Sequence, residues 1–431
     1  MAGFRHDGDE KKKNNKYIMA RITPFKGLRP KKELAAEVAT LPYDVVSVAE
    51  AREFRKDKYN FYHVTRSEID LPENVDVHSY QVYERAKENL DSFIKEKILV
   101  QDKEPCYYIY ELVMNGRSQT GLVCGSSIDD YNEGVIKKHE FTRPEKEKDR
   151  IEHITITGAQ TGIVFLAYND CESVQTIIDN WKKDHAPEYD FTCADGVRHI
   201  FWVIDNYAKV ASITHNFNTD VPCTYIADGH HRAASAAKVC KEMRENGYSI
   251  DGNESFNYFV TCIFPASQLA ILDYNRVVKD LNSYTHEQFI AALDADFTVT
   301  AQGKTAFKPA VPHEFGMYLG GNWYKMVCKP GTYADDPIGV LDVSILQENV
   351  LGKLLAIYDQ RTDKRIDFVG GIRGMQELEK RVDSKDMEVA FSIYPVSIQQ
   401  LFKIADSGNV MPPKSTWFEP KLRDGLVVYT I

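Results

Sequence analysis

The sequence lacks the marks of several well-defined protein classes. Its 431 residues contain no apolar run of about eighteen residues or more, so no transmembrane helix is expected. No two of its eight cysteines form a C-x-x-C pair, which argues against a zinc or dithiol motif. The Walker pattern G-x-x-x-x-G-K, the glycine-rich loop of protein kinases and G-x-S-x-G are also missing. The best-known phosphate loops and the nucleophile elbow of hydrolases are therefore not expected.

An excess of positive charge and an apolar leader are missing as well. The formal net charge is −10, which argues against a general nucleic-acid binder. The first residues, MAGFRHDGDEKKKNNK, have no apolar core of a secretory signal, so we expect residues 1–16 to form a disordered charged tail. Most cysteines stand in apolar runs and predict buried, reduced thiols. These features predict a cytoplasmic protein with neither a membrane nor a nucleic-acid partner.

What remains is the composition of an ordinary globular protein. The hydrophobic content is 43% and the charged content 27%, and the chain is long enough for two lobes or domains. The strand and helix patterns mix hairpins with crossovers, and no internal repeat or low-complexity segment interrupts them. We therefore predict an α+β fold rather than a doubly wound sheet.

Local signals mark several of the expected elements. Ser47 and Glu50 form a capping-box pattern at the start of a helix. Residues 78–98, HSYQVYERAKENLDSFIKEKI, carry apolar side chains at helical spacing. A tight hairpin is expected at Asn115-Gly116, and a second one within FGMYLGGNWYKMVCK. These elements alone do not indicate a function.

The most informative stretch is TYIADGHHRAASAAKV, residues 224–239, where a strand pattern meets a helix pattern. A helix start presents free backbone N–H groups and the positive end of the helix dipole, which attract anions. Gly229 lets the backbone approach a ligand closely, and Asp228 is suited to hold Mg²⁺ against a phosphate. The donors that the first turn adds are His230, His231 and Arg232. If Asp228 only capped the helix, the other polar residues would have no role, because capping needs one residue.

Three further charged motifs carry candidate residues. A charge run such as IKKHEFTRPEKEKDRIEH is usually a solvated helix face, but here a His-Glu pair precedes Thr-Arg-Pro. That mixture could supply a base, from His139 or Glu140, and several phosphate ligands. The other two motifs, YDQRTDKRIDFVGGIRG and MPPKSTWFEPKLRDG, lie near the end of the chain. The candidate phosphate ligands in the three motifs are Lys138, Arg143, Lys146, Arg361, Arg365, Lys414 and Lys421.

Seven separated motifs carry a family resemblance from about residue 20 to the end of the chain. They are LPYDVVS, NFYHVTRSEIDLP, GVIKKHEFTRPEKEKDR, YIADGHHRAASA, ILDYNRVVKDL, RTDKRIDFVGG and MPPKSTWFEPKL. Together they resemble a family catalogued as domain of unknown function 1015, whose members look like serine kinases that use inorganic pyrophosphate. The DGHHR element is similar to the D-G-H-x-R loop of free-serine kinases in the ParB/sulfiredoxin-like superfamily. In those kinases the loop binds the phosphoryl donor and Mg²⁺, and a distant carboxylate activates the serine hydroxyl.

The resemblance implies an architecture and a reaction. Residues 17–265 would form a catalytic portion similar to ParB and the serine kinases, with a mixed sheet and insertions. Residues 266–431 would form a family-specific α/β lobe that contributes to the active-site cleft. The implied reaction is phosphoryl transfer from pyrophosphate to the hydroxyl of free L-serine, giving O-phosphoserine, with Mg²⁺ on Asp228. Pyrophosphate has no base or ribose, so a site richer in cations than in aromatic slots suits it.

The resemblance leaves the general base and the competing functions open. Asp44 comes early in the chain, as the carboxylate of the serine kinases does, but theirs is a Glu, and Glu140 is the competitor. The long stretch between Asp44 and Asp228 requires a large insertion. The alternatives are an ADP- or ATP-dependent small-molecule kinase, a phosphatase-like hydrolase with the same loop, a ParB-like regulator that binds nucleotide or nucleic acid, and a non-catalytic scaffold. The sequence does not indicate the oligomeric state.

Overall fold

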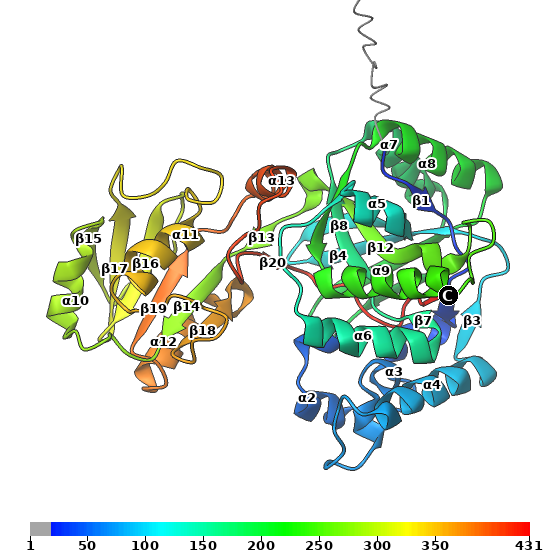
Figure 1. Ribbon diagram of the computed structural model, residues 1–431, viewed down its shortest axis with the longest axis horizontal. Coiled ribbons are helices and arrows are strands. Elements are labelled where there is room, and N and C mark those ends of the chain that lie inside the picture. The colour runs from blue at the N-terminus through cyan, green and yellow to red at the C-terminus, as the bar shows by residue number, and fades with distance from the viewer. Residues whose placement is uncertain (1–18) are drawn as a thin grey trace, which may run out of the picture.

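The computed structural model describes residues 19–431, so the tail expected at residues 1–16 lies outside the described residues. The chain forms a larger and a smaller lobe, which meet at a narrow waist (Figure 1). None of the helices in the described part of the chain is both long and apolar enough to cross a membrane. All eight cysteines are free, and five of them are buried.

A nine-stranded sheet forms the centre of the larger lobe, in the order β6-β11-β8-β12-β5-β4-β10-β9, with β1 paired to β5. β11 runs parallel to β6 and β12 runs parallel to β8, whereas the other pairs are antiparallel. The sheet is therefore mixed, and the α+β prediction holds at the level of a mixed α/β protein. Its strands are β1 (Ile22–Thr23), β4 (Tyr107–Met114), β5 (Arg117–Ser127), β6 (Ile136–Lys137), β8 (Val164–Tyr168), β9 (Tyr189–Thr192), β10 (Arg198–Ile204), β11 (Thr224–Asp228) and β12 (Tyr258–Pro265).

Alternating apolar side chains give this sheet two buried faces. Helices cover one face, and on the other face side chains such as those of Tyr108 and Phe165 share a core with Val427 and Tyr429 near the end of the chain. α6 packs against α9, and α4 packs against α6 in turn (Figure 1). The helices of this lobe are α1 (Ala35–Val38), α2 (Val48–Glu53), α3 (Tyr62–Thr65), α4 (Tyr80–Lys95), α5 (Ile128–Glu133), α6 (Pro144–Thr157), α7 (Glu172–Asp184), α8 (Tyr207–Asp220) and α9 (His230–Glu245).

The local sequence signals are confirmed in this lobe. Ser47 and Glu50 form both hydrogen bonds of the capping box at the start of α2. The residues of α4 expected at helical spacing, among them Leu90 and Phe93, are buried. Asn115 and Gly116 turn the β4–β5 hairpin with φ values of 51° and 77°. Local chemistry therefore sets the positions of these elements.

The smaller lobe is built on a six-stranded sheet in the order β15-β17-β16-β19-β14-β18, in which all pairs are antiparallel. The second expected hairpin joins β16 to β17 through Gly320 and Gly321, and both have positive φ. The strands are β14 (Tyr274–Val278), β15 (Phe297–Gly303), β16 (Glu314–Leu319), β17 (Asn322–Cys328), β18 (Ile366–Gly370) and β19 (Val389–Ile393). The helices are α10 (His286–Leu293), α11 (Asp342–Leu346), α12 (Gly374–Asp383) and α13 (Ile398–Asp406).

The end of the chain returns to the larger lobe. β20 (Trp417–Phe418) pairs with β13 (Ile271–Leu272) at the waist, and β21 (Tyr429–Thr430) pairs with β7 (Ala159–Gln160). A third short pair joins β2 (Leu28–Pro30) to β3 (Leu99–Gln101). The proposed division at residue 265 stays a prediction, because the last residues pair with strands on its N-terminal side. This return path carries the MPPKST motif past the start of α9.

Candidate functional site

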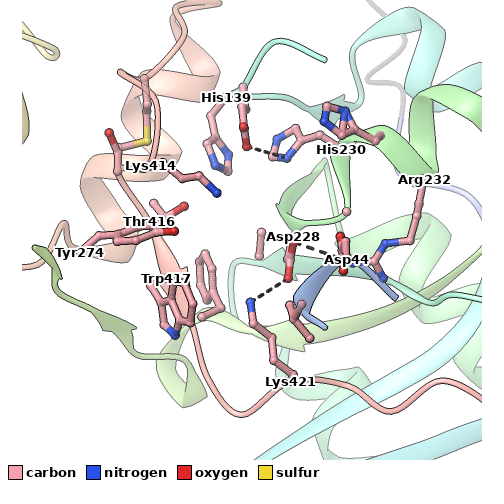
Figure 2. A pocket seen from close by; sticks show the side chains of 18 of the residues that line it. Asp44, His139, Asp228, His230, Arg232, Tyr274, Lys414, Thr416, Trp417 and Lys421 are labelled. Atoms are coloured by element: carbon pink, nitrogen blue, oxygen red, sulfur yellow. Dashed lines mark hydrogen bonds and ion pairs between the residues drawn. The ribbon is translucent and has the colours of Figure 1, made fainter. Parts of the chain in front are cut away.

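A cavity of about 380 Å³ opens at the start of α9, between the larger lobe and the returning C-terminal segment (Figure 2). It collects residues from five of the sequence motifs, which lie far apart along the chain. The candidates brought together in its wall are Asp44, His139, Glu140, Lys146, Asp228, Gly229, His230, His231, Arg232, Lys414 and Lys421. We call residues 228–232 the loop wall and residues 411–421 the lysine wall.

The loop wall is shaped by a turn that only glycine suits. The register of β11 shifts just before Asp228, and α9 begins at His230. Gly229 between them has φ +96°, and a Cβ there would lie 3.1 Å from Cζ of Arg232. The glycine therefore lets the Arg232 side chain fold back beside the turn, where its Nη1 donates to the carbonyl of Ile163.

Asp228 forms the centre of a charged group in the cavity. Its Oδ2 accepts a hydrogen bond from Nζ of Lys421 at 3.0 Å, and its Oδ1 lies 3.8 Å from Nη2 of Arg232. The same Nη2 lies 3.9 Å from Oδ2 of Asp44. Burial raises the pKa of Asp228, but Lys421 and Arg232 lower it more, so the carboxyl stays ionised well below its usual range. Arg232 thus approaches both carboxylates with the same nitrogen atom (Figure 2).

Three histidines in the cavity wall carry buried nitrogens without hydrogen-bond partners. They are Nδ1 of His139, Nε2 of His230 and Nδ1 of His231. The rings of His139 and His230 meet edge to face, with centroids 4.5 Å apart. Burial lowers the pKa of His139 to about 4 and that of His230 well below its usual value. Both rings are neutral at pH 7, so each carries a single N–H. The N–H of His139 is used in its hydrogen bond to the backbone of Ile226, whereas His230 can offer its N–H to a ligand.

Burying polar atoms without partners is unfavourable by roughly 1–3 kcal/mol each, so such atoms are rare in native proteins. In this cavity Nε of Arg232 lacks a partner as well. The unpaired atoms cluster on the loop wall, beside the free N–H groups at the start of α9. An anionic ligand with several acceptor oxygens would satisfy them together.

The lysine wall faces the loop wall from the C-terminal segment. The backbone N–H of Met411 donates to the carbonyl of His139 at 2.9 Å, which fixes the start of this wall. Nζ of Lys414 lies 5.7 Å from the ring centre of Tyr274, and Nζ of Lys421 lies 5.1 Å from the ring of Trp417. The two aromatic faces are therefore covered by ammonium groups rather than left open.

The two candidate bases differ in their surroundings. Asp44 lies in a short 3-10 helix after α1, and its side chain is 32% exposed beside Arg232. Glu140 is 53% exposed and lies 3.7 Å from Nδ1 of His230. Desolvation raises the pKa of Glu140, and Asp228 raises it further, while Lys414 and Lys146 lower it. Asp44 therefore lies deeper among the charged groups.

Four predicted phosphate ligands lie outside the cavity wall. Nζ of Lys138 stacks on the ring of Tyr131 at 3.7 Å, and Arg143 is exposed at the start of α6. Arg361 and Arg365 lie on the surface of the smaller lobe. Each of these two arginines is neutralised by the aspartate two residues before it, Asp359 or Asp363. The two D-x-R spacings in DQRTDKR account for this local pairing.

Sequence reasoning missed several residues of the site. Tyr43 and Tyr274 line the cavity, and each adjoins a motif residue, so their neighbours in the sequence gave a signal. Asp424 gave no signal in the sequence. It is 2% exposed, and its Oδ2 has no hydrogen-bond partner. Burial raises the pKa of Asp424 to about 7, although Arg232 lowers it. This carboxyl group lies behind Arg232, next to Gly162.

The donor set fits a magnesium ion. Mg²⁺ prefers oxygen ligands and is commonly held by one or two carboxylates together with phosphate oxygens. Asp228 is ionised, is 33% exposed to the cavity and has Asp44 on the other side of Arg232. No cysteine lines the cavity, and the group next to Asp228 that could add a ligand is a second carboxylate, Asp44, which shares Nη2 of Arg232 with it. The chemistry is therefore that of a hard cation rather than of zinc.

Comparison with solved structures finds similarities at low identity and low TM-score. A mutant of free serine kinase in complex with AMP has 12% identity and a TM-score of 0.35, covering 69% of this chain and 87% of that one. SbnI with a C-terminal truncation, from Staphylococcus aureus, has 11% identity and a TM-score of 0.37, covering 71% and 86%. A conserved hypothetical protein from Pyrococcus furiosus has 14% identity and a TM-score of 0.32, covering 70% and 93%.

The sequence comparisons give one result. Comparison with curated proteins finds no match. The family model described as "Protein of unknown function (DUF1015)" matches residues 22–344, which is most of the chain. The family resemblance is thereby confirmed over this range, which contains five of the seven motifs, and the chain belongs to the DUF1015 family.

Proposed function

We propose that the protein is a cytoplasmic kinase that transfers a phosphoryl group from inorganic pyrophosphate to the hydroxyl of free L-serine. The bond between the serine Oγ and phosphorus forms, and the bond from that phosphorus to the bridging oxygen breaks. Orthophosphate leaves, and the hydroxyl proton passes to a carboxylate of the enzyme. The products are O-phosphoserine and orthophosphate. The eight unpaired cysteines suit the reducing cytoplasm.

The observation that carries this proposal is the group of unpaired donors on the loop wall. Nε2 of His230, Nδ1 of His231, Nε of Arg232 and the N–H groups at the start of α9 all border one small cavity. Phosphoryl transfer depends mainly on positioning and on electrostatic stabilisation of the phosphate oxygens. Donors that are already fixed need no reorganisation when charge moves during the reaction. The resemblance of DGHHR to the loop of serine kinases supports the same reading.

The choice of pyrophosphate over a nucleotide rests on the lysine wall. A nucleotide base needs an open aromatic or apolar slot, but lysine ammonium groups stand over the faces of Tyr274 and Trp417. The cavity contains the cations Lys146, Arg232, Lys414 and Lys421. Pyrophosphate is small and highly charged, so it can pair with these cations and needs no aromatic or apolar slot.

Residues of the cavity take separate roles in this reaction. Asp228 would hold Mg²⁺, which when bound neutralises donor oxygens that would otherwise repel the attacking hydroxyl. Arg232, together with the neutral rings of His230 and His231, would hold the phosphate oxygens. Lys146, Lys414 and Lys421 would balance the remaining negative charge.

We assign the general base to Asp44, with Glu140 as the competitor. Asp44 is close to Arg232 and lines both this cavity and a neighbouring one, whereas Glu140 lines only this cavity. A carboxylate base in contact with the hydroxyl typically contributes about 10²–10⁴-fold to the rate. Asp44→Asn should therefore lower kcat strongly at a nearly unchanged KM for pyrophosphate. Glu140→Gln should lower it less.

The test is product formation with three donors in parallel. Purified protein is incubated with L-serine and Mg²⁺ together with pyrophosphate, ADP or ATP, and phosphoserine is measured by mass spectrometry. Phosphoserine only with pyrophosphate is the expected result. Phosphoserine only with a nucleotide would keep the kinase and reject the donor. If folded protein gave no product in any tube, serine kinase activity would be rejected.

A further inference from the structure

A second cavity, of about 540 Å³, adjoins the first on the side of Asp44. Both cavities are lined by Tyr43, Asp44, Lys146 and His231, so these residues form a shared boundary. The rest of the second cavity is lined mainly by residues 65–68, by the turn before α4, and by α4 and α6. Residues 65–68 belong to the motif NFYHVTRSEIDLP, which the phosphate site does not use.

The second cavity contains a buried pair of opposite charges. Nε of Arg66 lies 3.1 Å from Oε1 of Glu68, and the two side chains are 18% and 5% exposed. Neither of these two atoms forms a hydrogen bond with good geometry. The pair is therefore close enough to neutralise its charges but leaves hydrogen-bonding capacity unused.

The walls that hold this pair are fixed by hydrogen bonds. Nε2 of His153 on α6 lies 3.0 Å from the carbonyl of Val64. The hydroxyl of Ser67 donates to the carbonyl of Val82 on α4 at 2.5 Å. The chain on each side of Arg66 is thus tied to a different helix, and the pair is held in a preformed position.

We propose that the second cavity is the acceptor subsite, and that Arg66 and Glu68 recognise the α-carboxylate and α-ammonium groups of a free amino acid. The inference rests on the proposed kinase function and names the part of the site that selects the acceptor. A zwitterion brings one charge of each sign and no net charge. Arginine binds a carboxylate through two parallel N–H groups, and a carboxylate accepts from an ammonium group.

A zwitterion suits this pair for an energetic reason. Burying an unpaired charge is strongly unfavourable, and removing one partner of a buried pair leaves such a charge behind. An acceptor with only a carboxylate would compete with Glu68 for Arg66 and leave Glu68 unpaired. An amino acid satisfies both residues at once. The cavity therefore discriminates against hydroxyl compounds that lack either group.

The arrangement also orients the acceptor hydroxyl. For phosphoryl transfer, an amino acid held by Arg66 and Glu68 must turn its hydroxyl toward the shared boundary with the phosphate cavity. Asp44 lies on that boundary, whereas Glu140 lines only the first cavity. The same geometry therefore favours Asp44 as the base for the acceptor hydroxyl.

The test fills the second cavity without touching the first. Val77 lies in the turn before α4, is half-buried and lines the second cavity only. Val77→Trp should raise the KM for L-serine by roughly ten-fold or more, because a hydrophobic side chain that occupies a ligand pocket excludes the ligand. The KM for pyrophosphate should stay unchanged. Val75→Trp is the matched control, since Val75 is half-buried in the same turn but lines neither cavity.

A second variant tests the recognition of the carboxylate. Arg66→Lys keeps the charge but loses the two-pronged fork, so the preference for L-serine over ethanolamine should fall. Glu68→Gln should likewise reduce the preference for L-serine over D-glycerate. Arg198→Lys is the control, because Arg198 pairs with Asp190 at the opposite edge of the sheet. Thermal unfolding of every variant shows that it is folded.

The outcomes separate this inference from the proposed function. Suppose that the wild type makes phosphoserine and that Val77→Trp and Val75→Trp have the same KM for L-serine. The acceptor then does not bind in the second cavity. If the wild type makes no phosphoserine, the proposed function fails, and L-serine binding is then measured by calorimetry. Binding that is lost in Val77→Trp alone supports the subsite. No binding, or equal binding in both variants, rejects it.

Discussion

The loop wall and the lysine wall enclose the same cavity but are built differently. On the loop wall His230 and Arg232 are almost completely buried, and their positions follow from the start of α9 and the turn at Gly229. On the lysine wall the ammonium groups stand on long side chains, and Lys414 is exposed. The loop wall therefore fixes where the donor oxygens lie. The lysine wall supplies charge that can adjust to them.

Gly229→Ala, on the loop wall, is the substitution expected to lower activity most. The new Cβ would press on the guanidinium of Arg232, and φ +96° is unfavourable for alanine. Because a displacement of about 1 Å at a reacting centre can lower the rate about 10²-fold, kcat should fall by two orders of magnitude or more. Unfolding in urea should show only a small loss of stability. Normal kcat in folded protein would show that the turn does not position Arg232.

Lys421→Met tests the one lysine that touches the loop wall. It removes the hydrogen bond to Oδ2 of Asp228 and part of the cause of the low pKa of Asp228. Loss of a hydrogen bond between charged groups amounts to about 1.5–3 kcal/mol, so kcat/KM should fall about ten- to hundred-fold. Steady-state kinetics at several Mg²⁺ concentrations would measure this fall in kcat/KM. An effect as small as that of Lys414→Met would remove the distinction between the two lysines.

A pH titration of stability probes the carboxyl group behind the loop wall. Burial raises the pKa of Asp424 to about 7 from about 4 in the unfolded chain. The folded state favours the protonated carboxyl group. The stability gained from this preference is fully present below about pH 4 and is lost as the pH rises through 7. We expect wild type to lose on the order of 2 kcal/mol relative to Asp424→Asn between pH 5 and 8.

Urea unfolding of both proteins at the two pH values measures this difference. Asp424→Asn should also keep its stability when the pH is raised, because asparagine does not titrate. Parallel pH profiles for the two proteins would mean that Asp424 is ionised throughout, and that Arg232 stabilises it fully.

Lys414→Met should have a smaller effect, mainly on the KM for pyrophosphate. Lys414 is exposed, so its attraction to the donor is screened by salt. We expect a rise in KM of roughly two- to five-fold at low ionic strength that shrinks at about 1 M salt. The effect of Gly229→Ala should not depend on salt. Equal salt dependence in both variants would contradict the division of roles between the walls.

Arg361→Met should have the smallest effect. The guanidinium of Arg361 is bound by Asp359 on the surface, and exposed pairs contribute about 0–1 kcal/mol to stability. Both kcat/KM and the unfolding midpoint should match those of the wild type. A large loss of activity would show that the lobes close during turnover and carry Arg361 into the cavity.

The sequence predicted the elements that depend on local chemistry. The capping box at Ser47, the turn at Asn115 and Gly116, and the strand–turn–helix around Gly229 are set by neighbouring residues, so their patterns could be read directly. The sheet order could not be read in the same way, because it depends on pairing between distant strands. The return of residues 424–430 to the larger lobe is such a pairing.

The site was predictable where residues stand next to a recognisable motif. The loop wall followed from one short stretch, and Lys414 and Lys421 from another. The charge patterns of Arg361 and Arg365 resembled those of phosphate ligands, but an aspartate two residues away neutralises each of them. Asp424 gave no signal, because its role depends on burial behind Arg232, which only the tertiary structure provides.

The most direct test of the central claim is a phosphorus NMR spectrum of one reaction. Wild-type protein is incubated with L-serine, Mg²⁺ and pyrophosphate, and the phosphorus signals are followed over time. The account predicts that the pyrophosphate signal is replaced by signals of phosphoserine and orthophosphate in equal amounts. Orthophosphate alone, or an unchanged pyrophosphate signal in folded protein, would contradict it.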